Sequence, residues 1–156
     1  WTQNRCALFR RLWRALGVFM DIDKLQSEAE NGSVVSQTIL GILYLEGDGV
    51  TKNYAKAKLL LESASEKGVP RAMSTLGRIY ELGLGVEKNL NEASSLYQAS
   101  AEAGEFLPHI WLARMLNVAG YEEDALYHYE QAASMSGIAD CAELEEAKEH
   151  VRKANT

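Results

Sequence analysis

Two similar stretches decide the fold: "GILYLEGDGV" at residues 41–50 and "GRIYELGLGV" at residues 77–86. Each begins with glycine, has tyrosine three residues later, and ends in Gly-x-Gly-Val. Such a segment could be a phosphate-binding loop or a structural joint. A phosphate loop needs a preceding strand and a following Lys-Ser/Thr, and a dinucleotide site needs a third glycine. Neither context is present, so we interpret both stretches as joints and expect no nucleotide cofactor.

The repeat extends well beyond these two stretches. Shifted by 36 residues, the chain overlays on itself at glycines and apolar positions alike. The matching pairs are Leu40/Leu76, Gly41/Gly77, Tyr44/Tyr80, Gly47/Gly83, Gly49/Gly85, Val50/Val86, Asn53/Asn89, Ala57/Ala93, Leu60/Leu96 and Gly68/Gly104. A fixed period of this length indicates one supersecondary unit stacked on the next.

Each period reads as two helices. Apolar residues recur at helical spacing over about 35–46, and Gly-x-Gly-Val then ends the helix, because glycine adopts the left-handed backbone that helix ends require. Asn53 is a predicted N-cap for a second helix that runs to Gly68. Few prolines and many helix-forming residues support an all-α chain of antiparallel helix pairs.

The pattern L-G-x-x-Y-x-x-G-x-G-V, followed by alanine and then glycine, resembles the Sel-one-like repeat (SLR), a relative of the tetratricopeptide repeat (TPR). The resemblance covers residues 33–104. It implies a right-handed α-α superhelix, an α-solenoid, whose concave wall is lined by the first helix of each pair. Relatives bind proteins or peptides on that wall.

The resemblance also divides the chain. We expect a single repeat domain over 1–156. Its parts are a degenerate N-terminal helix pair (5–32), two Sel-one-like repeats (33–68 and 69–104), a TPR-like repeat (105–137) and a capping helix (138–154). The third unit has Ala113 in place of glycine and lacks Gly-x-Gly. A tighter turn and a change of curvature are therefore predicted near Gly120.

Composition narrows the function classes. The net charge of -6 argues against nucleic acid as a partner, because phosphate binding needs a basic patch. No apolar run approaches the roughly 20 residues of a membrane span. The two cysteines, Cys6 and Cys141, show neither C-x-x-C spacing nor a disulfide framework, which favours a reducing, cytoplasmic compartment. The chain begins at Trp1, as a processed product would, so a periplasmic or secreted location stays open.

The first twenty residues contain arginines and no acid. In this segment Phe9, Leu12, Trp13, Leu16 and Met20 share one helical face, and Arg10, Arg11 and Arg14 share the other. A membrane-surface helix has this pattern. We favour packing against the next helix pair, because the first strong repeat would otherwise expose an apolar flank. A membrane-surface adaptor remains an alternative.

Catalytic and metal-binding patterns are weak. No G-x-S-x-G, Cys-His set or H-E-x-x-H occurs, so we predict no enzyme activity and no catalytic residues. Glu146 and His150 could share a helical face, but two ligands on an acidic helix are more often a solvated pair, and no metal is predicted. His109 and His128 have no cysteine or carboxylate pair nearby in sequence.

The TPR frame, placed on Gly41, Gly77 and Ala113, gives the predicted protein-binding positions. They are Thr38, Ile42, Arg71, Ser74, Arg78, Glu81, Ile110, Arg114 and Asn117. Arg78 and Arg114 occupy the same position in adjacent units. They either hold a carboxylate of a partner or pair with the chain's own glutamates, such as Glu81.

Four aromatic residues are further anchor candidates: Tyr97, Trp111, Tyr127 and Tyr129. Tyr97 and Tyr129 stand at pattern positions that pack between helices, so we assign these two to the core. The sequence thus predicts a non-enzymatic adaptor that binds a protein or peptide with acidic or C-terminal carboxylate groups. An immunity or inhibitor protein that covers a toxin or enzyme is the alternative within binding proteins.

Overall fold

The computed structural model describes residues 21–135 and 142–154, and every regular element in these ranges is an α-helix. They are α2 (Ile22–Glu30), α3 (Val34–Glu46), α4 (Tyr54–Glu66), α5 (Pro70–Leu82), α6 (Leu90–Glu102), α7 (Leu107–Val118), α8 (Glu122–Ser134) and α9 (Ala142–Ala154). The predicted all-α fold class is confirmed. The N-terminal amphipathic helix expected within residues 1–20 lies outside the described residues.

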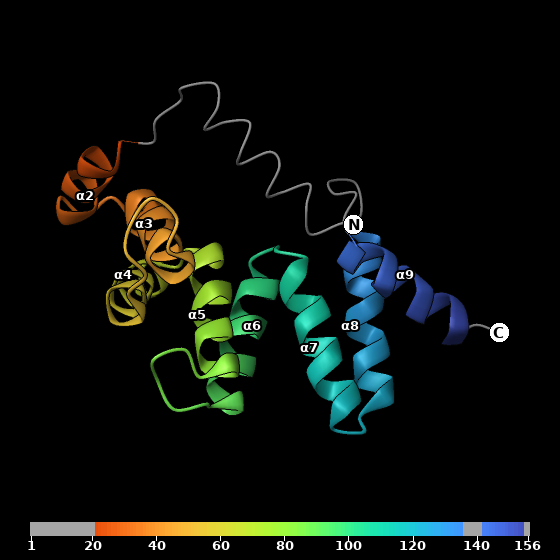
Figure 1. Ribbon diagram of the computed structural model, residues 1–156. Helices are drawn as coiled ribbons and strands as arrows, with labels where there is room; N and C mark the ends of the chain where they lie inside the picture. The colour runs from red at the N-terminus through yellow and green to blue at the C-terminus, as the bar shows by residue number, and fades with distance from the viewer. Residues whose placement is uncertain (1–20, 136–141, 155–156) are drawn as a thin grey trace.

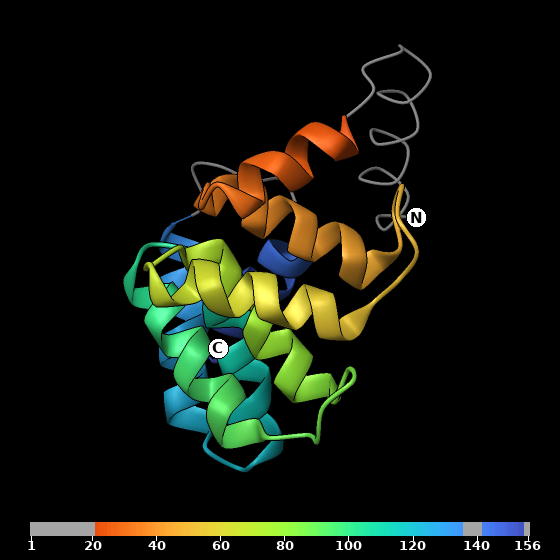
Figure 2. The same ribbon diagram turned by 90° about the vertical axis from the view of Figure 1, so that its left-hand side faces the viewer.

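The helices form a stack in which the chain reverses at each turn. The pairs α3/α4, α5/α6 and α7/α8 follow one another, with α2 packed on α3 and α9 packed on α8 (Figure 1). Figure 1 shows α3 and α4 nearly end-on while α5 to α8 run along the vertical, so the helix direction turns along the stack. Seen from the side, α2 lies above α3 and α3 above α4 (Figure 2).

The joints in the first two pairs have the predicted chemistry. Gly47 and Gly83 end α3 and α5 with left-handed φ angles of 75° and 67°. Asn53 caps α4 by accepting a hydrogen bond from the Lys56 backbone N–H at 3.0 Å, which confirms the predicted N-cap. Asn89 caps α6 in the same way, accepting from the Glu92 N–H at 3.1 Å. The glycines therefore stop one helix and the asparagines start the next.

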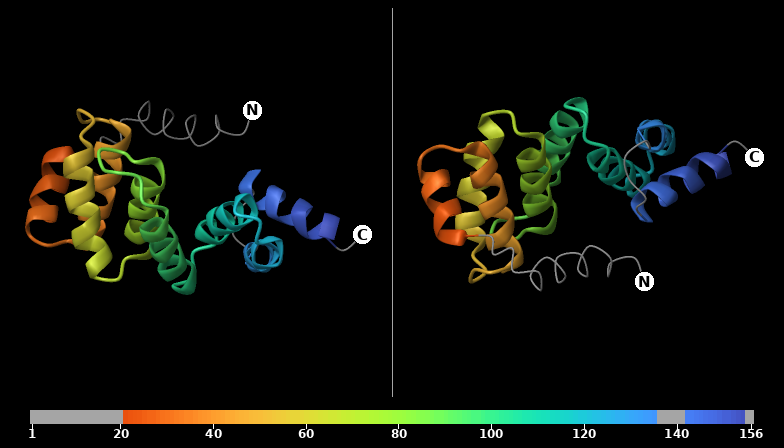
Figure 3. Two further views of the ribbon diagram at one scale, coloured as in Figure 1. Left: turned by 90° about the horizontal axis from the view of Figure 1, so that it is seen from below. Right: turned by 90° about the horizontal axis from the view of Figure 1, so that it is seen from above.

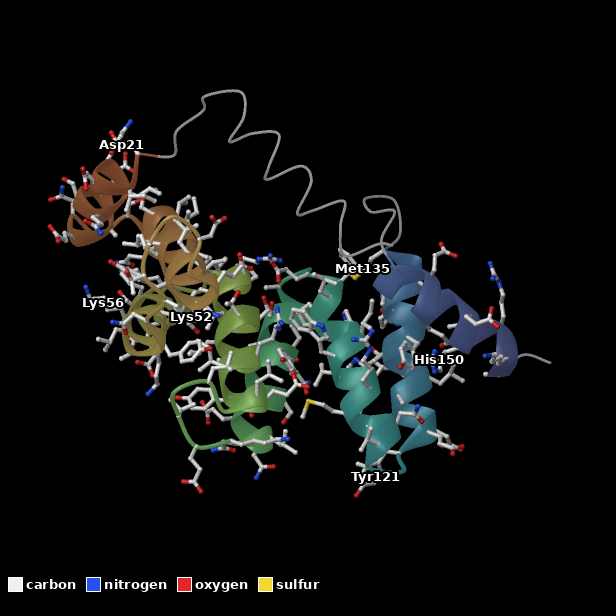
Figure 4. All side chains as sticks on the ribbon, viewed as in Figure 1. Asp21, Lys52, Lys56, Tyr121, Met135 and His150 are labelled. Atoms are coloured by element: carbon white, nitrogen blue, oxygen red, sulfur yellow. The ribbon has the colours of Figure 1, made fainter. Side chains whose placement is uncertain are left out.

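The third pair has a different joint. Residues 119–121 connect α7 to α8, whereas residues 47–53 and 83–89 connect the earlier pairs. Gly120 has a φ of 87°, and Tyr121 at the N-cap position of α8 forms no side-chain capping bond (Figure 4). The predicted tighter turn is present. The change of curvature stays a prediction.

Small residues let the paired helices approach closely. A Cβ added to Gly41 would lie 2.7 Å from Leu61 Cγ, and one added to Gly77 would lie 2.7 Å from Tyr97 Cε1. The third pair has Ala113 at this position, buried in one cluster with Tyr129. The core is divided into several such clusters that follow one another along the stack, which is how a solenoid is stabilised by neighbour contacts.

Candidate functional site

Three of the nine predicted binding positions are buried. The Thr38 hydroxyl donates to the Val34 carbonyl at 2.7 Å, and Ile110 is fully buried in the α7/α8 cluster. Ser74 donates to a Glu105 carboxylate oxygen at 2.9 Å, which joins α5 to the start of the next unit. A frame based only on repeat spacing assigns these side chains to the groove. Their burial gives them packing roles instead.

The other six positions divide by exposure. Ile42 and Glu81 are half-buried, and Ile42 packs against the cluster that contains Leu61. The exposed members are all polar and lie on the first helices of the second and third pairs: Arg71, Arg78, Arg114 and Asn117. The predicted binding positions that are exposed therefore lie on α5 and α7.

Arg78 and Trp111 form the contact that joins these two helices. The Arg78 guanidinium carbon lies over the Trp111 ring, 5.6 Å from its centroid. Trp111 in turn packs on Tyr97 of α6, with ring centroids 5.1 Å apart at an interplanar angle of 46°. Cation–π stacking of this kind holds a guanidinium in place over the indole. Side chains from α5, α6 and α7 thus meet at one point.

Glu81 is already engaged at this point. The Tyr97 hydroxyl donates to Glu81 Oε2 at 2.6 Å. Burial raises the pKa of Tyr97 above its usual value, and the hydrogen bond to Glu81 raises it further, so Tyr97 stays a neutral donor. Within residues 21–135 and 142–154, neither Arg71 nor Arg78 forms an ion pair. Of the two alternatives for Arg78, pairing with Glu81 is therefore not formed.

The aromatic candidates separate as expected. Tyr97 and Tyr129 are buried, which confirms their assignment to the core, whereas Trp111 is half-buried and Tyr127 is exposed. Trp111 is thus the aromatic side chain that combines partial exposure with a place on α7 beside Arg78.

Sequence reasoning missed one contact, between His109 of α7 and His128 of α8. Their Nδ1 atoms lie 3.1 Å apart. Burial lowers the pKa of both imidazoles. The contact depends on the register of the antiparallel pair, in which Ala113 and Tyr129 share a cluster. This register comes from the packing of α7 on α8, so the spacing of the two histidines in the sequence does not reveal the pair.

A shallow cleft lies at the C-terminal end of the stack, between α7, α8 and α9. Its volume is about 300 Å³, and its lining residues are Asn117, Glu122, Glu123, Ala125, Leu126, Tyr129, His150 and Ala154. His150 stacks on Tyr129 with centroids 4.2 Å apart (Figure 4). The Glu146 side chain, considered with His150 as a metal pair, lies outside the described residues.

Metal-ligating groups and membrane spans were also considered for the described residues. No group of three or more metal-ligating side chains occurs among the residues that the structure describes. Within the same residues, none of the helices has the length and apolar character needed to span a membrane.

Comparison with protein families identifies the repeat. The family model described as Sel1 repeat matches residues 34–69, 70–105 and 121–136. The first two matches each contain a complete helix pair, α3/α4 and α5/α6. The third begins at Tyr121 and contains α8 alone, in agreement with the altered joint before it. A search of curated proteins found no match.

Solved structures of similar proteins have the same fold. A Sel1 repeat protein from Oxalobacter formigenes is 33% identical, and the match covers 85% of this chain and 98% of that one with a TM-score of 0.69. A protective antigen present in uropathogenic Escherichia coli strains, displaying an SLR fold, is 27% identical with a TM-score of 0.70. That match covers 86% of this chain and 32% of the antigen.

Proposed function

Because the chain belongs to the Sel1 repeat family, we propose that it is a non-catalytic interaction module whose partner binds at α5 and α7 around Arg78 and Trp111. Sel1 repeat proteins are generally scaffolds that bind other proteins. The fold alone does not choose a partner, since function depends on the side chains it carries. The exposed side chains of α5 and α7 indicate which kind of partner the module would bind.

One observation carries the proposal: an exposed arginine stacked on tryptophan without a carboxylate. The Arg78 guanidinium lies 5.6 Å from the Trp111 centroid and forms no ion pair with a described residue. An exposed guanidinium that forms no ion pair keeps its N–H donors available, and their planar arrangement matches the two oxygens of a carboxylate. Stacking also limits the rotamers that binding would have to fix, so less entropy is lost on association.

Two further arginines extend this surface. Arg71 lies two turns before Arg78 on α5, and Arg114 lies one turn beyond Trp111 on α7. Both are exposed. These arginines supply positive charge on a chain whose net charge is -6, and positive charge attracts acidic groups. The partner we propose is therefore a protein segment with acidic side chains or a C-terminal carboxylate.

Pull-down from the native host with three matched baits tests the proposal. The baits are the wild type, Arg78→Ala, and Lys24→Ala, whose side chain is exposed on α2. A partner retained by the wild type and Lys24→Ala but lost by Arg78→Ala supports the site. A fourth bait, Arg78→Lys, should retain little of the partner, because an ammonium lacks the planar fork of a guanidinium. Equal retention by all baits would place the interface elsewhere.

An inhibitor or immunity role is the second candidate, favoured by the acidic net charge, which suits a basic toxin or enzyme. A toxin encoded by a neighbouring gene would support it, and a loss of toxin activity on mixing the two proteins would establish it.

A membrane-surface adaptor role rests on residues 1–20. Liposome flotation with and without these residues tests it, because only an adaptor loses lipid binding on truncation.

A further inference from the structure

The His109–His128 contact has the geometry of a hydrogen bond between two imidazoles. The Nδ1 atoms lie 3.1 Å apart, and the ring centroids lie 5.4 Å apart at an interplanar angle of 41°. The centroid separation exceeds the nitrogen separation by about the sum of the two distances from a ring centre to its Nδ1, so the rings point at each other end-on. One Nδ1–H therefore donates and the other Nδ1 accepts.

This alignment suits a shared proton better than a metal ion. Two imidazoles that bind one metal direct their lone pairs at a common point to the side of the line between them, whereas these lie along that line. Among the described residues no third metal-ligating side chain completes a site. The contact is thus a link between α7 and α8 that depends on protonation.

Among the described residues, one carboxylate influences the protonation of this histidine pair. Asp124, one turn before His128 on α8, is the acid that favours its protonated form. Tyr127 packs edge-on against His128 with centroids 5.3 Å apart. Near the start of α7, the Glu105 carboxylate accepts hydrogen bonds from Ser74 and Ser100. Burial opposes protonation of both histidines.

On α9 the third histidine, His150, lies against Tyr129 rather than against the pair.

We propose that the His109–His128 pair is a proton-sensitive clamp that holds α8 on α7 near neutral pH and releases it in acid. In the neutral pair each ring carries one proton, and the donor's Nδ1–H forms the bond. A first added proton takes the donor's free Nε2, and the bond survives with a cationic donor. A second added proton must bind the accepting Nδ1, and this removes the lone pair that accepts the hydrogen bond. Two N–H groups and two positive charges then face each other.

The sign of the pH dependence follows from the surroundings. Burial lowers the pKa of both histidines, so the unfolded chain binds more protons than the folded chain in mild acid. The contribution of the pair to stability is present above a pH of about 6.5 and is lost as the pH falls through the lowered values. Because α7 also carries Trp111, release would loosen one side of the proposed binding surface; this last consequence rests on the proposed function.

Thermal unfolding of the full chain at pH 7.5 and pH 5.0 tests the clamp without any partner. We expect the Tm of the wild type to fall between these pH values by roughly 2–4 °C more than that of His128→Asn, whose amide cannot titrate but can still accept a hydrogen bond. Lys24→Ala, which changes an exposed side chain on α2, is the control and should show the same fall as the wild type. An equal fall in the wild type and His128→Asn would overturn the proposal.

Residue-specific NMR titration of the wild-type imidazoles gives a second measurement that needs no variant to fold. His109 and His128 should titrate together, below the ordinary histidine pKa of about 6.5. Independent titration of these two histidines near that ordinary value would also refute the clamp. Loss of partner binding in Arg78→Ala leaves both measurements unchanged, so the clamp and the proposed function fail separately.

Discussion

The second and third helix pairs solve the same packing problem with different residues. In the pair α5/α6, Gly83 and Asn89 build a long joint, and Gly77 lets the Tyr97 ring approach the helix backbone. In the pair α7/α8 the joint is short and uncapped by a side chain, and Ala113 takes the glycine position. The repeat thus keeps its helix pairing when its most recognisable residues are lost.

The two pairs also differ in the polar and aromatic contacts that hold their second helices in place. His109 bonds to His128 across α7 and α8, and Tyr129 stacks on His150 of α9. In the second pair the corresponding tyrosine, Tyr97, contacts Glu81 and Trp111 instead. Figure 3 shows the ribbons of α5/α6 and α7/α8 following one another along the stack. Both pairs therefore keep the same spacing of buried apolar residues, whereas the joint and the polar contacts differ.

The largest expected effect comes from filling the close approach in the second pair. Gly77→Ala places a Cβ 2.7 Å and 2.8 Å from two Tyr97 ring carbons and 3.3 Å from the Ala93 carbonyl oxygen. Overpacking against a rigid ring should cost roughly 1–3 kcal/mol of unfolding free energy despite the better helix propensity of alanine. Denaturant unfolding measures this cost.

The matched change in the third pair is the reverse substitution, Ala113→Gly. It relieves no clash and should cost about 1 kcal/mol, mainly through helix propensity. If Gly77→Ala were neutral or stabilising, glycine would not be required by the Tyr97 contact.

A smaller effect is expected from Tyr97→Phe, which removes the hydroxyl that donates to Glu81 at 2.6 Å. The loss should be about 1–2 kcal/mol, because the hydrogen bond has a charged acceptor but Glu81 is only half-buried and regains water. Thermal and denaturant unfolding measure it, with Tyr127→Phe as control, since the Tyr127 side chain is exposed on α8. Equal stability of Tyr97→Phe and the wild type would contradict a stabilising role for this bond.

The smallest effect concerns the joints. Asn89→Ala removes the side chain that caps α6 and should cost about 1 kcal/mol, as should Asn53→Ala for α4. Tyr121→Ala at the corresponding position of α8 removes no capping bond and should cost less. Unfolding curves of the three variants compare the joints directly, and equal costs would show that capping does not distinguish them.

Much of the fold could be predicted from the sequence because its signals are local. The glycines at 47 and 83 and the asparagines at 53 and 89 act within a few residues, and the apolar spacing fixes which faces pack. The core assignment of Tyr97 and Tyr129 followed from the same spacing.

The site was harder to predict because it depends on contacts between elements. Repeat spacing could not show that Thr38, Ser74 and Ile110 are buried, since their exposure depends on how the next helix covers them. Nor could it show that Arg78 meets Trp111 of the following unit, or that His109 meets His128. Both contacts join residues whose distance in space is set by helix register and stacking.

The most direct test of the central claim is the affinity of the captured partner for Arg78→Ala compared with the wild type, by titration calorimetry at fixed salt. Truncation of a central arginine anchor should weaken binding roughly 10-fold or more. Arg114→Ala should weaken it in the same direction, and Lys24→Ala should leave it unchanged. Unchanged affinity in correctly folded Arg78→Ala and Arg114→Ala would contradict a carboxylate-binding surface on α5 and α7.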